Sequence, residues 1–126
     1  MRMMSFALTE RQLMDGSKTV TRRTGWKNLR PGERLLAVRK AMGLKAGVRA
    51  QPLCEIEVVS VRRESLDSIT NDDCAREGFP HFLAADFVDM FCEEMHVDPT
   101  HEVTRIEFRK VPGSERANTQ TTLAIS

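Results

Sequence analysis

The pattern of apolar and polar positions along the chain predicts several short strands and helices. Alternating apolar residues and β-favouring residues predict strands at 19–23, 34–39, 53–61 and 103–110. From Cys54 the apolar positions are even-numbered up to Val58 and odd-numbered from Val59, which predicts a β-bulge at that point. Cap residues predict a helix at 66–77, and apolar residues with helical spacing predict one at 83–96.

These elements predict an α+β fold, with a small curled β-sheet or barrel flanked by short helices. A doubly wound parallel sheet is excluded because strands and helices do not alternate regularly. The chain has 126 residues, which suits one domain. We expect the domain to occupy residues 1–111 and the polar residues 112–126 to form a flexible tail.

A short helix is also expected near the start of the chain, directly before the first of these strands. Thr9 and Gln12 have the spacing of a capping box, and Gly16 suits the left-handed position that ends a helix. Lys18 then lies at the turn from helix to strand, closely followed by the hydroxyls of Thr19 and Thr21. A cation beside hydroxyl groups at the mouth of a strand is typical of an anion-binding or catalytic site.

The net charge is +1, but the charges are segregated along the chain. Residues 18–49 contain ten Lys or Arg and one acid, whereas residues 55–102 contain thirteen acids and three arginines. The basic segment predicts a polyanionic partner such as RNA. The alternative is that the two segments lie beside each other and neutralise one another, and the charge pattern leaves both open.

The remaining composition indicates a cytoplasmic protein without cofactor or metal. Three cysteines without a CxxC pair are typical of reduced thiols, and no apolar run approaches the ~20 residues of a membrane helix. No signal peptide is recognisable at the start of the chain. Cys92 and His96 lie four apart on a predicted helix, but no second pair has the spacing of metal ligands.

The order of the elements and five segments within them resemble the ASCH family, small domains of the PUA-like superfamily. The segments that carry the resemblance are Leu13–Arg23, Leu29–Glu33, Ile56–Val58, Ala75–Phe79 and Val103–Phe108. The resemblance covers residues 3–110, and the form of the chain looks like that of phage or prophage relatives. It implies a PUA-like β-barrel with a cleft between the first strand and the helix that ends at Glu77.

The resemblance also implies a function. One branch of small bacterial ASCH proteins hydrolyses the amide of N4-acetylcytidine with a lysine, a threonine and a glutamate, and these residues fall on Lys18, Thr21 and Glu77. We therefore expect an amidohydrolase of N4-acylated cytosine nucleosides, with Lys18 as base, Thr21 as nucleophile and Glu77 as proton shuttle. Lys18 and Thr21 have opposite parity on the strand, so the lysine must curl over to reach the threonine.

Substrate contacts are expected from Thr19, Arg23 and Trp26. An alternative from another class is a non-catalytic module that binds RNA or modified bases, with RNA along residues 18–49 and Trp26 stacked on a base. An ASCH-type ribonuclease is a third possibility. The basic insertion around 43–52 and the C-terminal extension depart from the family pattern and bear on the size of the substrate.

Overall fold

The computed structural model describes residues 1–40, 44 and 46–116. The strands are β1 (Met3–Ser5), β2 (Val20–Arg23), β3 (Arg34–Val38), β4 (Pro52–Ser65) and β5 (Glu102–Lys110). The helices are α1 (Glu10–Asp15), α2 (Asn71–Arg76) and α3 (Ala84–Met95), and a 3-10 turn spans Leu66–Ser68.

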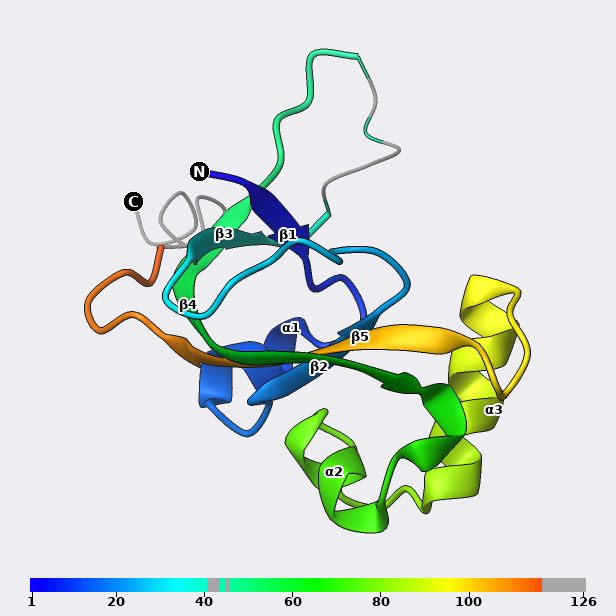
Figure 1. Cartoon of the computed structure of the whole chain (residues 1–126). Coiled ribbons are helices and arrows are strands. Elements are labelled where there is room, and N and C mark those ends of the chain that lie inside the picture. The colour runs from blue at the N-terminus through cyan, green and yellow to red at the C-terminus, as the bar shows by residue number, and fades with distance from the viewer. Residues whose placement is uncertain (41–43, 45, 117–126) are drawn as a thin grey trace.

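The strands form one curled, unclosed sheet with the order β1-β3-β4-β5-β2 (Figure 1). The pairing of β1 with β3 is parallel, and the other pairs are antiparallel. The predicted α+β class, with a small curled sheet and short flanking helices, is confirmed. Because β1 and β2 occupy the two edges of the sheet, β2 has one side available to other parts of the molecule.

The long strand β4 contains the predicted bulge. Its register against β5 shifts between Val58 and Ser60, where the apolar parity changes in the sequence. The strand also continues beyond the predicted end to Ser65, because residues 60–65 pair with β5. This extension carries few apolar side chains, so an apolar pattern could not predict it.

Two of the expected helices differ in detail from the structure. The prediction of a capping box at α1 is wrong. The Thr9 side chain makes no capping hydrogen bond, and the side-chain amide of Gln12 (Nε2) instead donates to the Gly78 carbonyl oxygen at 3.3 Å. Gly16 does end α1 in the left-handed region, with φ of 84°. The helix predicted at 66–77 is divided, because Thr70 accepts a hydrogen bond from Asp73 N and starts α2 anew.

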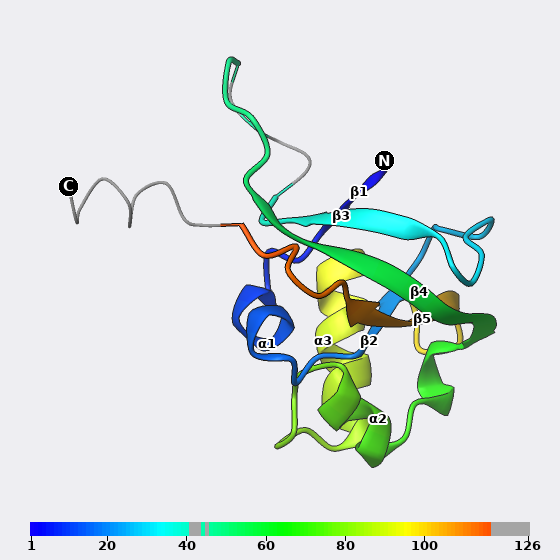
Figure 2. The same ribbon diagram turned by 90° about the vertical axis from the view of Figure 1, so that its left-hand side faces the viewer.

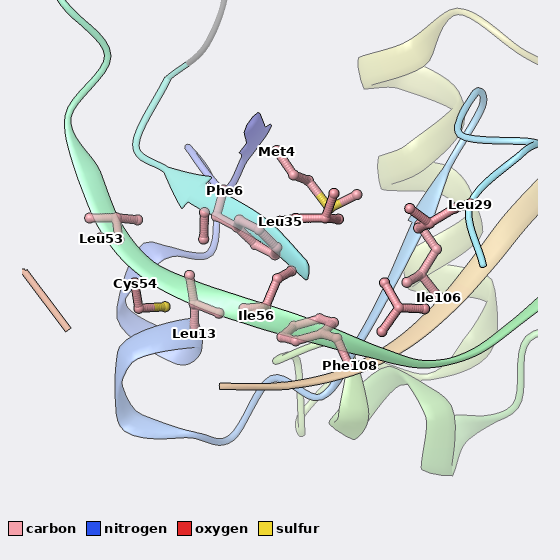
Figure 3. Close-up of a cluster of buried hydrophobic side chains, with 12 residues drawn as sticks. Met4, Phe6, Leu13, Leu29, Leu35, Leu53, Cys54, Ile56, Ile106 and Phe108 are labelled. Carbon is pink, nitrogen blue, oxygen red and sulfur yellow. The ribbon is translucent and has the colours of Figure 1, made fainter. Parts of the chain in front are cut away.

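Strand β1 was not predicted, because three residues are too few to establish a pattern. Met4 within it and Phe6 after it are both buried in a first hydrophobic cluster with Leu13, Ile56 and Phe108 (Figure 3). The first cluster therefore packs β1 and α1 against one face of β3, β4 and β5.

A second hydrophobic cluster lies around the helices that follow β4. It contains Leu66, Cys74, Phe87, Phe91 and Val103, from the 3-10 turn, α2, α3 and β5. Both views show α2 and α3 near each other beneath the β2–β5 side of the sheet (Figures 1 and 2). The two clusters thus leave a boundary between them next to β2.

The described residues that follow β5 remain attached to the sheet. Ser114 is buried and accepts a hydrogen bond from the Glu55 amide, and Arg116 N donates to the Leu53 carbonyl oxygen. Part of the expected tail, 117–126, lies outside the described residues, as do residues 41–43 and 45 of the basic insertion.

The structure also shows the state of the cysteines and the lengths of the helices. Cys54, Cys74 and Cys92 are free thiols, and the first two are buried. A bilayer span needs about 20 apolar residues, whereas the longest helix formed by the described residues, α3, has 12.

Candidate functional site

A cavity of about 240 Å³ lies beside the edge strand β2, at the boundary of the two hydrophobic clusters. Its walls come from the end of β1 and the segment after it, from Lys18 and β2, from the residues that follow α2 and from α3. The charged side chains on its walls are Lys18, Arg22, Arg23, Glu77 and Glu94, and the hydroxyl side chains are Ser5, Thr9 and Thr21. All three residues predicted to be catalytic, Lys18, Thr21 and Glu77, therefore line one cavity.

Lys18 and Glu77 form a buried ion pair in the polar part of the cavity lining. The Lys18 ammonium donates to the Glu77 carboxylate (Oε1) at 3.0 Å and to the Glu77 carbonyl oxygen at 2.7 Å. Both side chains are only 3% exposed. A buried charge is tolerated when it is paired and hydrogen-bonded, and this pair satisfies both conditions.

Local backbone geometry places Lys18 against Glu77, although 59 positions separate them. Gly16 turns the chain out of α1, and the Thr19 amide then donates to the Arg76 carbonyl oxygen at 2.8 Å. This bond ties the start of β2 to the last turn of α2. Glu77 follows Arg76 directly, and Gly78 leaves the helix with φ of 100°.

Burial lowers the pKa of Lys18 below its ordinary value of about 10.4. The charge and hydrogen bond of Glu77 oppose this effect, and the cations of Arg23 and Arg22 add to it. Desolvation disfavours the ammonium form, so a larger fraction of neutral amine is available than for a lysine in water. A neutral amine can accept a proton.

Thr21 and Arg23 lie on the same side of β2, as their parity predicts. The Thr21 hydroxyl oxygen accepts a hydrogen bond from Arg23 Nε at 3.1 Å, and Arg23 Nη2 donates to the Ser5 carbonyl oxygen at 2.6 Å. Within the described residues, no hydrogen bond joins Lys18 to Thr21. Although Lys18 and Thr21 have opposite parity along the chain, both side chains line the cavity.

Arg22 is the centre of a buried network that the sequence did not reveal. Its guanidinium donates to Glu77 Oε2 at 3.1 Å, to Glu64 at 3.0 Å and to Asp73 at 2.5 Å. Arg105 donates twice to Asp73, each bond being 2.8 Å long. Hydrogen bonds from Arg105 and Arg22, opposed by burial, hold the pKa of Asp73 well below its usual range.

Much of the remaining lining of the cavity is apolar. It includes Phe6, Phe79, Phe87, Met90, Phe91 and Met95. The 83–96 pattern predicted that its apolar stripe belongs to the core, and Phe87 and Phe91 are buried there. The same residues also face the cavity, which helical spacing alone could not indicate. The site thus combines a largely aromatic apolar lining with charged and hydroxyl groups.

Two of the residues expected to contact substrate lie elsewhere. Thr19 does not line the cavity, and its backbone is hydrogen-bonded to Arg76 and Phe108. Trp26 packs partly against the first hydrophobic cluster, with the Arg2 guanidinium 5.0 Å from the centre of its ring. Arg23, the third, does line the cavity.

A second, polar hollow of about 430 Å³ lies on the other side of Arg22. It is lined by Arg22, Ser60, Arg62, Glu64, Ser68, Thr70, Asp73, Arg76, Arg105 and Glu107. Arg22 lines both hollows, so we call this second one the polar groove adjoining the cavity. Its arginines are largely paired with its acids, as in the contact of Arg62 with Glu64.

Part of the basic segment forms ion pairs with the acidic segment in the structure. Lys18, Arg22 and Arg34 from the basic segment pair with Glu77, Asp73 and Glu57 from the acidic one. Mutual neutralisation therefore accounts for these cations. Exposed cations of the same segment include Lys27, Arg30, Lys40 and Arg49. Among the described residues, no three His, Cys, Asp or Glu side chains are grouped so as to hold a metal ion.

Comparison with solved structures identifies the fold. The ASCH domain of Lactobacillus crispatus superposes with a TM-score of 0.62 at 15% identity, covering 86% of this chain and 78% of that one. The ASCH protein of Zymomonas mobilis superposes with a TM-score of 0.52 at 14% identity, over 98% and 92% of the two chains. A protein of Enterococcus faecalis superposes with a TM-score of 0.60 at 16% identity, over 86% and 72%. No family model and no curated protein sequence matches the chain.

Proposed function

We propose that this chain, which has the fold of ASCH domain structures, hydrolyses the amide of N4-acylated cytosine nucleosides. The observation that carries the proposal is the meeting of Lys18, Thr21 and Glu77 at one cavity, with Lys18 and Glu77 paired at 3.0 Å. Amide cleavage needs a nucleophile, a proton acceptor and a proton donor for the departing amine. These three residue types can supply those roles in that order: Thr21, Lys18 and Glu77.

The first step is attack by Thr21 on the acyl carbon. Neutral Lys18 accepts the proton of the Thr21 hydroxyl as the oxygen bonds to that carbon, and the carbonyl oxygen becomes negatively charged. The lowered pKa of Lys18 favours this step, because it increases the fraction of enzyme with a free amine. In the resting structure the ammonium is held by Glu77, so proton loss from Lys18 precedes attack.

The second step is departure of the cytosine amine. The ammonium of Lys18 lies within hydrogen-bond distance of Glu77, so a proton can pass from the lysine to the carboxylate and on to the leaving nitrogen. The carbon–nitrogen bond then breaks, leaving an acyl ester on Thr21. Water, activated by the reverse route, hydrolyses this ester and restores the hydroxyl. These reaction steps require no external oxidant, reductant or cofactor.

The apolar wall supports a planar substrate. Phe79, Phe87 and Phe91 can contact the face of a pyrimidine or the methyl of an acyl group, while the polar groups of the lining contact the amide.

Incubation of the purified chain with N4-acetylcytidine tests the proposal. We expect cytidine and acetate to form in equal amounts, separable from substrate by chromatography. N4-acetylcytosine, which lacks the ribose, shows whether the base alone is sufficient. Complete recovery of both acylated compounds after prolonged incubation would contradict the proposal.

RNA binding, with or without cleavage, is a second candidate function. The polar groove favours this function, because the side chains of Arg62 and Arg76 within it are about half exposed or more. The groove adjoins the cavity through Arg22. Binding to phosphates would weaken as salt rises, and Arg62→Gln should reduce the salt dependence. Absent or salt-insensitive binding of single-stranded RNA would exclude this candidate, and recovery of intact RNA would exclude the ribonuclease form.

A further inference from the structure

Arg23 differs from the other two cations that line the cavity. Lys18 is neutralised by Glu77, and Arg22 by Glu77, Glu64 and Asp73. Within the described residues, the Arg23 guanidinium contacts no carboxylate. Burial lowers its pKa to about 10, partly opposed by Glu77, so Arg23 is protonated at neutral pH. The cavity therefore contains one full positive charge without an ion-pair partner.

The position of this charge is fixed by three contacts. Arg23 Nη2 donates to the Ser5 carbonyl oxygen at 2.6 Å, and the guanidinium carbon lies 5.0 Å from the centre of the Phe6 ring. Arg23 Nε donates to the Thr21 hydroxyl oxygen at 3.1 Å. A guanidinium has five N–H donors, so others remain for a ligand in the cavity. The cation is thus held beside the hydroxyl oxygen before any substrate binds.

This inference rests on the proposed function. We propose that Arg23 is a catalytic residue that stabilises the negative charge developing on Thr21 Oγ1 and then on the oxygen of the tetrahedral intermediate. A donor preorganised at a developing oxyanion stabilises it without rearrangement at the moment of reaction. The uncompensated charge is then useful: a carboxylate beside Arg23 would already occupy the donors and weaken the field at Thr21.

The geometry also separates the roles of the two neighbouring arginines. Arg22 points into the acidic network and holds Glu77, whereas Arg23 points toward the hydroxyl that reacts. Arg22 is therefore a positioning residue, and Arg23 contacts a reacting atom. Thr21 and Arg23 form a pair whose function needs both the hydroxyl and the cation.

Binding of phenylboronic acid tests this pair independently of the natural substrate. Its trigonal boron accepts a hydroxyl oxygen; as the Thr21 proton moves to Lys18, boron becomes tetrahedral and negatively charged, which mimics the intermediate. We expect a tetrahedral boron signal in ¹¹B NMR with wild type, at a pH at which free phenylboronic acid is trigonal. Arg23→Gln should abolish the signal, Arg23→Lys should retain part of it, and the exposed-site control Arg30→Gln should leave it unchanged. Melting curves of each variant report whether it is folded.

Kinetics with N4-acetylcytidine provide the second readout. Removal of one oxyanion donor typically lowers kcat by about 100-fold or more, so Arg23→Gln should lower kcat by that order with little change in KM. A folded Arg23→Gln variant with the kcat of wild type would overturn the role of Arg23 but leave the proposed function intact. A tetrahedral boron signal that depends on Arg23, without turnover of acetylcytidine, would support the Thr21–Arg23 pair and reject that substrate. Absence of the signal in wild type would overturn the inference.

Discussion

The Lys18 ammonium lies 3.0 Å from the Glu77 carboxylate and 2.7 Å from the carbonyl oxygen of the same residue. Both contacts favour the protonated lysine, whereas burial favours the neutral amine, and the net effect lowers the pKa of Lys18. These opposing effects act on the same ammonium group. Because the proposed base must be neutral, the rate of the proposed reaction should depend on pH.

We predict that kcat/KM for acetylcytidine rises with pH through the pKa of Lys18, at a pH below the ordinary value of about 10.4. Glu77→Gln should lower the rate, because the proton shuttle is lost, and move the rising limb to lower pH. The sign follows because Glu77 raises the pKa of Lys18 and its removal leaves burial unopposed. The exposed control Glu93→Gln should leave the limb in place. If kcat/KM rose over the same pH range in Glu77→Gln and wild type, the role of Lys18 as base would be contradicted.

We predict that Asp73→Asn lowers the free energy of unfolding at neutral pH by about 3 kcal/mol, because it leaves Arg22 and Arg105 buried without their shared counter-charge. The folded-state pKa of Asp73 is depressed, so its stabilisation is present above its unfolded pKa and is lost as pH falls through the folded value. The difference between the two proteins should therefore shrink as the pH falls below about 4. Urea unfolding at several pH values measures it, and a difference that does not vary with pH would contradict this account.

Substitution of Gly78 tests the close approach between the end of α2 and Gln12 of α1. A Cβ at this position would lie 2.9 Å from the Cβ of Gln12, in addition to the strain of a φ of 100°. Gly16→Ala is the matched control, since its φ is 84° but no atom lies within 4 Å of the added Cβ. We predict that both variants are destabilised by roughly 1 kcal/mol or more, and that Gly78→Ala loses the larger amount because α1 and α2 must separate. Equal melting temperatures would show that this close approach is unimportant.

The sequence was informative where the relevant residues are neighbours or follow a period. Lys18 and Thr21 lie in one motif, and the bulge in β4 appears as a change of parity at Val58–Val59. The stripe on α3 was recognised, but periodicity identifies only which residues are apolar and not whether a cavity lies against them. Phe87 and Phe91 therefore appeared as core alone.

The rest could not be predicted because it depends on distant pairs. Arg22 and Asp73 are 51 positions apart, and Arg105 reaches the same carboxylate from β5. Both arginines looked like members of basic or alternating stretches with no distinguishing local pattern. Trp26 was expected among the substrate contacts; in the structure it packs partly against the first hydrophobic cluster, an arrangement that depends on residues distant in the sequence.

Removal of the Thr21 hydroxyl tests its role as the nucleophile, by comparison of the rates of cytidine release by wild type and Thr21→Val. Valine preserves the shape of the side chain and replaces the hydroxyl by a methyl group, and Thr24→Val makes the same exchange outside the cavity. We expect turnover by wild type and Thr24→Val, and a loss of at least about 1,000-fold in kcat for folded Thr21→Val. No turnover by wild type, or equal rates for wild type and Thr21→Val, would contradict this role.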